Sequence, residues 1–302
     1  MQIAAHILAY NVTRFLEAVL ANVTPFVDKV YVAHPYRPWN YAPEARNSRV
    51  NPTRKVDILS ACHDSKIEII EGDWSTEESM RNECLDRAKA DGFDWLLIQD
   101  ADEFYTEQSW AQIRKSLQGS IARDHLVTTW YNFWKSSQYV LTDSFGAIKQ
   151  TNAGFAVRCE PNIKFVQKRL TNASNSYVLD CPCYHYGYVM SDVDMREKLA
   201  TWGHARDFDV ERWFRYKWVN WRESTRYLHP THPREWMRAI RFPLQQPDFA
   251  ERFALSVRST EVISVRDVVG EAWFNARIGV RHRVKAGKRT ALSILRPGKV
   301  PG

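Results

Sequence analysis

The first half of the chain alternates short apolar runs with amphipathic segments. Four runs have the length and composition of strands, and those at 3–9 and 93–98 are apolar enough to be buried. Segments with apolar residues at helical spacing separate them, which predicts a strand–helix series with right-handed crossovers. We therefore expect an α/β fold whose mostly parallel central sheet carries helices on both faces. The four expected strands are residues 3–9, 29–33, 66–71 and 93–98.

Local signals place the helices between these strands. Asn11 is the expected N-cap of an amphipathic helix. Ser75, with Glu78 three residues later, forms a capping-box pattern that opens a second helix, and Gly92 ends it. Further helices are expected at 56–62 and around 110–117.

The pattern changes beyond residue 124. Short β-like runs follow one another, which predicts a mixed sheet that extends the parallel one, and from about residue 192 the chain becomes helical, aromatic and basic. One segment, 34–53, is rich in Pro, Asn and Arg without a hydrophobic period, so we expect a long loop that is functional or mobile. The β-like runs are 125–134, 137–141, 154–159 and 176–181.

Composition excludes several classes of protein. Of 302 residues, 44% are hydrophobic and 25% are charged, values typical of globular proteins and not of disordered chains. No window approaches 18 consecutive apolar residues, so we expect no transmembrane helix. The first residues lack the signals of a secretion peptide, and five scattered cysteines argue against a disulfide framework. A cytoplasmic location is the resulting expectation.

Charge is distributed unevenly. Residues 196–302 hold 22 Lys and Arg against 11 Asp and Glu, whereas residues 1–195 hold 20 against 24. A basic segment joined to a mildly acidic body is typical of proteins that bind a polyanion, such as nucleic acid or an anionic membrane face. A solvated basic surface with a frayed tail explains the same composition.

The strongest chemical signal is an acidic cluster behind the fourth expected strand. Asp100 and Asp102 directly follow the apolar run 95–98. Ligands of open α/β sheets bind beyond the carboxyl ends of the strands, and residues i and i+2 leaving a strand project to the same side. Two converging carboxylates favour a hard divalent cation, Mn²⁺ or Mg²⁺, which keeps positions open for a diphosphate. The alternative is a solvated acidic turn.

These residues also carry a resemblance. The stretch opened by Arg81 and Asn82 and closed by Asp94-Trp-Leu-Leu-Ile-Gln-Asp-Ala-Asp-Glu103 resembles the GT-A nucleotide-sugar transferases, particularly family-2-like members. The strand end 9–11 and the following Arg14 resemble that family's opening strand–helix unit, although Val12 and Thr13 stand where the family has an acidic residue. The resemblance covers about residues 1–200 and is most specific over 73–104.

The resemblance implies a GT-A fold, a UDP-sugar donor, a divalent metal and transfer of the sugar to a hydroxyl. It implies a catalytic domain over 1–200, with a donor half at about 1–105 and an acceptor half at about 106–200. Residues 201–302 are then a basic, mainly helical extension.

Carried over residue by residue, the family assigns roles within the acidic cluster and around it. Asp102 would coordinate the metal and act in catalysis, and Asp100 would approach both the ribose and the metal. Asp73 would read the nucleobase, Arg81 would lie near the diphosphate, and Tyr10 would flank the base. The implied donor-binding set is Ala9, Tyr10, Asn11, Arg14, Asp73, Arg81, Asp100 and Ala101.

Simpler interpretations stand beside two of these roles. Arg81 is also explained as a surface helix residue near Glu77 or Glu78, and Asp73 as an acid at the start of a helix. Independently of the resemblance, the leaving diphosphate accumulates negative charge in the transition state, and a metal cation and an arginine nearby would stabilise that charge.

A second constellation surrounds His185, which is our candidate for a third metal ligand because the family often adds a distant His. Gly187 follows it and permits close backbone approach. A structural histidine is the alternative. Cys181 and Cys183 next to His185 also raise the possibility of zinc, but the spacing lacks a C-x₂-C knuckle and a second pair.

The catalytic base is the least defined part of the site. An inverting mechanism needs a carboxylate to deprotonate the acceptor hydroxyl, and Asp192, just after the histidine motif, is our candidate beside Asp143, Glu160 and Asp180. A retaining mechanism needs no such base. Lys198, further along, resembles a phosphate-contacting family residue, although an ordinary amphipathic helix end is favoured there.

The aromatic and basic segment 211–222 has two interpretations. Phe214, Trp218 and Trp221 share a helical face with Arg215 and Arg222 beside it. The favoured interpretation is a buried aromatic core with solvated arginines; the other is a stacking platform for single-stranded or flipped bases.

Function is therefore expected to be that of a UDP-sugar-dependent glycosyltransferase with a polyanionic acceptor. A hydroxymethylated DNA base is one candidate acceptor, which would suit a phage enzyme in the host cytoplasm; a bacterial surface glycan or lipid-linked sugar is the alternative. A noncatalytic nucleic-acid-binding module and a metal-dependent nucleotidyltransferase are rivals of other classes.

Overall fold

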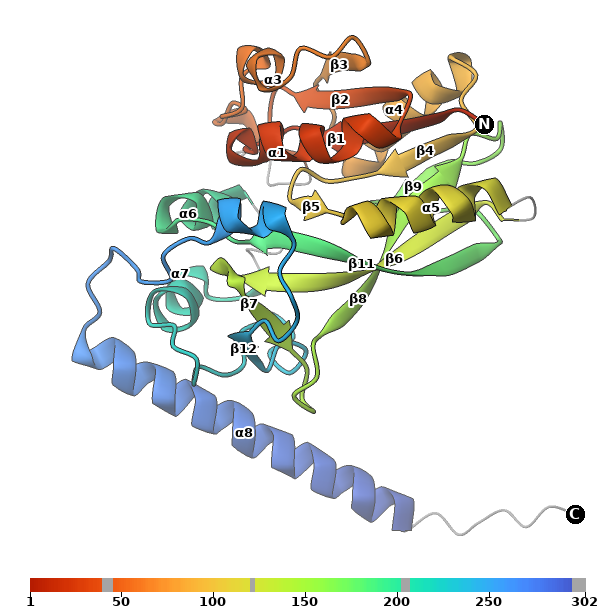
Figure 1. Ribbon diagram of the computed structural model, residues 1–302. Coiled ribbons are helices and arrows are strands. Elements are labelled where there is room, and N and C mark those ends of the chain that lie inside the picture. Colours follow the sequence, from red (N-terminus) through yellow and green to blue (C-terminus); the bar gives the residue numbers. More distant parts are fainter. Residues whose placement is uncertain (40–45, 120–122, 202–206, 295–302) are drawn as a thin grey trace, which may run out of the picture.

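The computed structural model describes residues 1–39, 46–119, 123–201 and 207–294, with side chains described as far as residue 280 (Figure 1). A ten-stranded sheet runs through the molecule in the order β12-β7-β6-β8-β4-β1-β2-β3, and β11 and β5 pair off this path. The half built from the first hundred residues is parallel and the other half is mixed, so the predicted GT-A-like α/β fold is confirmed by the sheet topology.

The parallel half contains the four strands that the apolar runs predict. β1 lies between β2 and β4, and β3 pairs with the outer edge of β2. All six residues of β1 and all four of β4 are buried, as expected of strands covered on both faces. The strands are β1 (Ile3–Leu8), β2 (Lys29–Pro35), β3 (Ile67–Gly72) and β4 (Trp95–Ile98).

Helices cover both faces of this half-sheet (Figure 1). Alternate residues of β1 enter two different core clusters, Ile3 with residues of α1 and α5, and Ala4 with residues of α4. This is the consequence of the two-residue period of a strand. The helices are α1 (Thr13–Val23), α3 (Lys55–Ala61), α4 (Glu77–Ala90) and α5 (Glu107–Gly119), and a 3₁₀ turn η1 (Thr24–Phe26) follows α1.

Two helix starts differ from the prediction. Val12, without a side-chain cap, precedes α1, while Asn11 adopts a left-handed backbone with φ 54° and donates its N–H to Asn51. Asn51 in turn donates to the carbonyl oxygens of Ala9 and Pro35. Asn11 therefore takes part in a contact between the end of β1 and the loop that contains Asn51, and it does not cap the helix. For α4 the cap is Thr76, one residue after the predicted Ser75. The tertiary contact of Asn11 with Asn51 thus replaces the expected cap of α1, and the cap of α4 lies one residue later than predicted.

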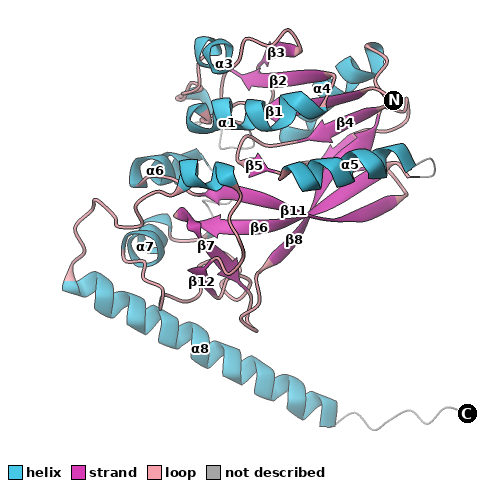
Figure 2. Cartoon of the chain, viewed as in Figure 1, coloured by secondary structure: helices cyan, strands magenta, loops and turns pink. Residues whose placement is uncertain are grey.

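The mixed half is built on long central strands (Figure 2). β8 pairs antiparallel with β4 and with β6, whereas β11 runs parallel to β6 and its far end pairs antiparallel with β5. The last pairing brings β11 next to the segment that follows β4. The strands are β5 (Glu103–Phe104), β6 (His125–Trp134), β7 (Ser136–Thr142), β8 (Gln150–Arg158) and β11 (Ser176–Tyr188), with a small hairpin of β9 (Phe165–Gln167) and β10 (Leu170–Thr171).

The chain beyond residue 191 is mainly helical but also supplies a strand, which the sequence pattern does not predict. β12 pairs antiparallel with β7, and Phe253 enters the core beside Phe15 and Phe104. The domain boundary at residue 200 stays a prediction, although this segment adds to both sheet and core. The elements are α6 (Asp192–Thr201), α7 (Val210–Trp213), the π-helical η3 (Phe214–Val219), β12 (Arg238–Arg241), the 3₁₀ segment η4 (Asp248–Phe253) and α8 (Val265–Ile294).

The aromatic segment packs inward. Phe214, Trp218 and Trp221 are buried in a second core cluster. The buried-core interpretation is therefore correct and the stacking-platform interpretation is wrong, because buried rings have no free face for a base. Arg215 forms an ion pair with Asp267 at 2.5 Å, so this arginine is also engaged within the fold.

In the part of the chain that the structure describes, none of the helices combines the length and apolarity needed to cross a bilayer.

Candidate active site

A cleft opens at the carboxyl ends of β1 and β4. From β1 the chain moves outward through α1 to β2, and from β3 it returns across the sheet through α4 to β4. The two strands thus flank the point where the strand order reverses, the usual position of a ligand crevice in an open α/β sheet. The cleft has a volume of about 210 Å³.

Most of the donor-binding residues predicted from the sequence line this cleft. They arrive from three places: the end of β1, the first turns of α1 and α4, and the segment after β4. α6 closes the opposite wall with Asp194 and Lys198. The predicted residues in the lining are Tyr10, Asn11, Arg14, Arg81, Asp100, Ala101 and Asp102.

Asp100 is held by two arginines. Its carboxylate lies 3.0 Å from Arg81 and 2.8 Å from Arg169, and Arg81 also pairs with Glu77 at 2.7 Å. Burial acts to raise the pKa of Asp100, but the charges and hydrogen bonds of Arg169 and Arg81 hold that pKa well below its usual range. Arg81 is fully buried, so it is no ordinary surface helix residue.

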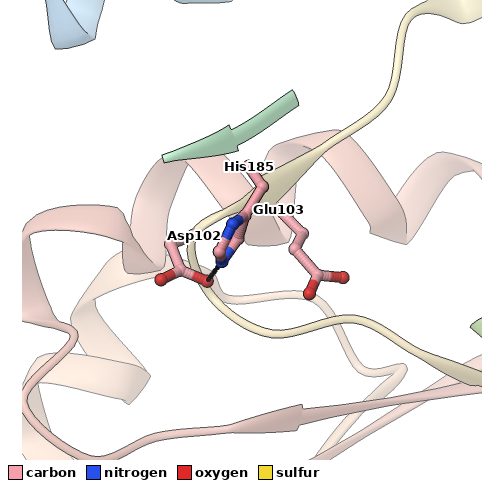
Figure 3. A group of neighbouring side chains, drawn as sticks. All are labelled: Asp102, Glu103 and His185. Carbon is pink, nitrogen blue, oxygen red and sulfur yellow. Dashed lines mark ion pairs between the residues drawn. The ribbon is translucent and has the colours of Figure 1, made fainter. Parts of the chain in front are cut away.

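The carboxylates brought together with His185 are those of Asp102 and Glu103 (Figure 3). One ligand atom from each of the three lies within 4.8 Å of the others, and Nε2 of His185 is 3.7 Å from Oδ1 of Asp102. The β5–β11 pairing produces this meeting, since His185 is the register partner of Glu103. The predicted pair of Asp100 and Asp102 is therefore not the group that the fold assembles with the histidine, and Asp100 as a metal ligand stays a prediction.

Neighbouring groups fix the imidazole of His185. Its Nδ1 lies 2.8 Å from the amide oxygen of Asn132, a partner that accepts a hydrogen bond, and its ring stacks on Trp130 with centroids 4.2 Å apart. This pairing assigns the proton to Nδ1 and leaves the lone pair of Nε2 facing Asp102. Burial lowers the pKa of His185 to about 4, although the Asp102 charge opposes the shift. The ring is therefore neutral near pH 7, the form that binds metals.

Glu103 is completely buried. Burial raises its pKa to about 8, and repulsion by Asp100 and Asp102 adds to the rise. The charge of Arg169, which donates a hydrogen bond to Glu103, acts in the opposite direction. Among the described residues, its Oε2 atom has no hydrogen-bond partner. An acceptor oxygen left without a partner in the interior is costly.

These three residues fit a divalent cation. Two carboxylates and a neutral imidazole are suitable ligands for Mn²⁺ and acceptable ones for Mg²⁺. A bound cation would displace the proton that the raised pKa keeps on Glu103 near pH 7. A cation would satisfy the orphaned oxygen of Glu103 and the lone pair of His185, and the amide of Asn132 already orients the ring as an outer partner of a metal ligand does. Among the described residues this is the one group of three such donors, so Cys181 and Cys183 belong to no zinc-like cluster.

Two further cations face the cleft. Arg14 lies 3.5 Å from Asp194, and the amine of Lys198 donates to the carbonyl oxygen of Gly187 at 2.6 Å. Burial lowers the pKa of Lys198 to about 8, although the negative charge of Asp102 acts to raise it. Asp194 balances the charge of Arg14, so Lys198 supplies the net positive charge of this wall opposite the acidic cluster.

Four predicted residues lie outside the cleft lining, and one of them, His185, lines a neighbouring groove instead. Ala9 is fully buried and Asp73 pairs with Arg46 at 2.6 Å. The carboxylate of Asp192 is used at the start of α6, where it accepts from the indole of Trp218 at 2.9 Å and from the hydroxyl of Ser259 at 2.6 Å. Such an engaged carboxylate is poorly placed to act as a general base.

A wider groove of about 910 Å³ adjoins the cleft and shares Glu77, Asp100 and Lys198 with it. Its floor is the face of β6 and β8, and its far wall is the segment before β12. The lining is mostly polar and aromatic, with few charges that are not already paired. It includes Trp130, Asn132, Thr151, Asn152, Tyr188 and Trp236.

Several residues of this site are absent from the sequence-based set. Arg169 comes from the β9–β10 hairpin, and no local signal marks it. Glu103 belongs to the acidic cluster, but only the β5–β11 pairing brings it to His185. Lys198 was expected at an ordinary helix end, yet it lines the cleft; the family resemblance at that stretch was the available signal.

No protein-family model matches the chain, and no curated protein matches it. Among solved structures, it is similar to residues 1–349 of TarS from S. aureus, with 13% identity over 68% of each chain and a TM-score of 0.39. It is also similar to HddC from Yersinia pseudotuberculosis, with 10% identity over 65% of this chain and 97% of that one and a TM-score of 0.39. Glucosyl-3-phosphoglycerate synthase from Mycobacterium tuberculosis, solved with UDP, matches at 12% identity over 45% of each chain and a TM-score of 0.30. At these TM-scores the likeness identifies neither a reaction nor a substrate for this chain.

Proposed function

We propose that this chain is a metal-dependent glycosyltransferase that moves a sugar from a nucleoside diphosphate sugar to an acceptor hydroxyl. One observation carries the proposal: Asp102, Glu103 and His185 gather beside the cleft at the switch point between β1 and β4. UDP is the nucleotide that the sequence resemblance implies.

The residues of the cleft have complementary tasks in this reaction. Asp102, with His185 and Glu103, would hold Mn²⁺ or Mg²⁺, which supplies positive charge to the departing diphosphate. Arg14 and Lys198 on the cleft wall would bind the same phosphates from the other side. The bond from the anomeric carbon to the diphosphate breaks, a bond to the acceptor oxygen forms, and the hydroxyl proton passes to the departing diphosphate or to water. Asp192 is not part of this proposal, because its carboxylate is engaged at α6.

The adjoining groove supports a glycan as the acceptor. The partly exposed Trp130 offers aromatic surface, and Thr151 and Asn152 offer donors and acceptors suited to hydroxyl groups. A polyanion such as modified DNA needs many unpaired cations, whereas Arg169 is already paired with Asp100 and the other Lys and Arg residues of the groove lining are Lys168 and Lys198. A saccharide acceptor is therefore favoured over the polyanionic acceptor expected from charge.

The test is release of nucleoside diphosphate from UDP-sugars with Mn²⁺, in the presence of glycan and of DNA acceptors. Asp102→Asn is expected to lower turnover at least about 100-fold and to weaken Mn²⁺ binding measured by calorimetry, because it removes a charged ligand. Asp86→Asn, an exposed acid on α4 with 73% of its side chain accessible, is the matched control.

Unchanged turnover and Mn²⁺ affinity in Asp102→Asn would contradict the metal role. Pyrophosphate release from a nucleoside triphosphate and a sugar phosphate, without release of diphosphate from UDP-sugars, would point to a nucleotidyltransferase instead.

A further inference from the structure

Helix α8 has two different faces. Its inner face is anchored on η3 by polar contacts: Asp267 pairs with Arg215 at 2.5 Å, and Glu271 lies 3.6 Å from Lys217. Both acidic side chains in the described part of α8 thus contact basic residues of η3 in the body of the protein.

The outer face of α8 is apolar and exposed. At 3.6 residues per turn, the exposed apolar positions of the described part of α8 fall within an arc of about 100° on the helix surface. Val265 is 81% exposed, Val269 63%, Trp273 62% and Val280 62%. Ala272 and Ala276, also exposed, lie within the same arc. An apolar stripe of this kind, left in solvent, marks an interaction surface.

Positive charge adjoins this stripe. The guanidinium of Arg277 lies 4.5 Å from the ring centre of Trp273, and Arg266 is exposed one residue after Val265. From residue 281 to the last residue the sequence has seven Lys or Arg and no Asp or Glu. The apolar stripe is thus bordered by Arg266 and Arg277 and followed in the sequence by seven further cations that have no acid among them.

We propose that α8 is an interfacial helix that docks the protein on an anionic lipid surface. Valines and a tryptophan on one face would enter the boundary between headgroups and acyl chains, where tryptophan is favoured, and the basic residues would meet the anionic headgroups. Charge complementarity selects this occupant, because an anionic membrane offers both the apolar layer and the negative charge that the helix lacks.

Two other occupants fit less well. The α8 helix of a second copy would present the same apolar stripe but no free acid in its described part, because Asp267 and Glu271 face η3, so the basic residues beside the stripe would find no counter-charge on that helix. Nucleic acid would meet the basic residues but would leave Val269, Trp273 and Val280 in water.

The proposal does not depend on the proposed function. α8 lies at the β12 end of the molecule, away from β1–β4 and the candidate active site (Figure 1). Loss of lipid docking would therefore leave release of diphosphate from a soluble substrate unchanged, and loss of the metal ligands would leave docking unchanged.

The experiment is flotation of the full chain with vesicles of phosphatidylcholine alone and of phosphatidylcholine mixed with phosphatidylglycerol. We expect binding to the anionic vesicles only, weakened by salt. The double variant Val269→Asp with Trp273→Asp is expected to lower the partition coefficient at least about tenfold, since it places two charges in the apolar stripe that would enter the membrane. Val56→Asp on α3, a helical valine that is 52% exposed, is the matched control and is expected to bind like the unaltered chain.

Equal binding by the double variant, or no preference for anionic vesicles, would overturn the proposal. So would a concentration-dependent dimer, seen by light scattering and abolished by the double variant, if vesicles failed to bind. Binding to duplex DNA that the double variant retains, without vesicle binding, would assign the basic segment to nucleic acid.

Discussion

Gly187 lies against the candidate metal ligands. A Cβ atom at this position would come within 2.7 Å of Nε2 and Cε1 of His185 and within 3.2 Å of Oδ2 of Asp102. The imidazole has little room to retreat, because Asn132 holds its Nδ1 and Trp130 stacks on its face. A glycine is needed at this point for close approach of the backbone and not for an unusual backbone angle.

Gly187→Ala is therefore expected to lower Mn²⁺ affinity and turnover at least about tenfold, because an added methyl group displaces the ring of His185 from Asp102. Calorimetric titration of Mn²⁺ and diphosphate release measure the two effects. Gly119→Ala, at the end of α5 with no atom within 4 Å of the new methyl group, is the control. A variant that binds Mn²⁺ as tightly as the unaltered chain would show that His185 is not a ligand.

At the level of single elements, α8 begins with a reciprocal cap. The Ser264 hydroxyl accepts from the N–H of Asp267 at 3.2 Å, and the carboxylate of Asp267 accepts from the N–H of Ser264 at 3.0 Å. The same carboxylate pairs with Arg215. Hydrogen bonds from Arg215 and Ser264 lower the pKa of Asp267. One carboxylate thus caps the helix and anchors it to η3.

Asp267→Asn is expected to lower the free energy of opening of the first turns of α8 by about 1 kcal/mol, which raises their amide exchange rate about fivefold near pH 7. A carboxylate with a lowered folded pKa contributes stability above its unfolded pKa of about 3.9 and loses it as the pH falls. The ratio of exchange rates between variant and unaltered chain should therefore decrease steadily as the pH falls below about 3.9, and it should approach one only when the pH passes the lowered pKa of the folded state. A ratio that stays constant as the pH falls would mean that the charge of Asp267 is not the cause.

For the molecule as a whole, the segment beyond residue 200 returns to the first half of the chain. β12 extends the sheet by pairing with β7, and Phe253 packs with Phe15, Phe104 and Tyr186. Long-range packing of this kind joins the two ends of the sequence in one core. We therefore expect a single cooperative unfolding transition for residues 1–254, and no separate melting of a segment that starts at residue 201.

Phe253→Ala is expected to lower the free energy of unfolding by about 3 kcal/mol, the usual cost of removing a buried phenylalanine ring. Urea titrations followed by far-ultraviolet and near-ultraviolet circular dichroism would measure it, and the two probes should give coincident curves. Phe145→Ala, at a β-turn where the ring is 94% exposed, should change stability little. Two separated transitions would support the predicted boundary at residue 200.

The parts of the fold that the sequence predicts are those with strong local periods. β1, β2, β3 and β4 fall within two residues of the predicted runs, and β6 matches its predicted range at both ends. β12 was missed because Arg238–Arg241 has one fully buried apolar residue, Ala239, and no apolar run. Its pairing depends on the presence of β7 and not on its own pattern.

The sequence by itself determined the α/β order of the first hundred residues, the acidic cluster after β4 and the excess of positive charge near residue 302, because each depends on neighbours along the chain. The tertiary structure alone decided which carboxylates meet His185, that two arginines hold Asp100, and that one stripe of α8 faces water. Those outcomes join residues far apart in sequence, such as Glu103 with Arg169 and Asn132 with His185. The physical reason is that strand pairing and burial set distances between side chains, and neither is written in any local period of the chain.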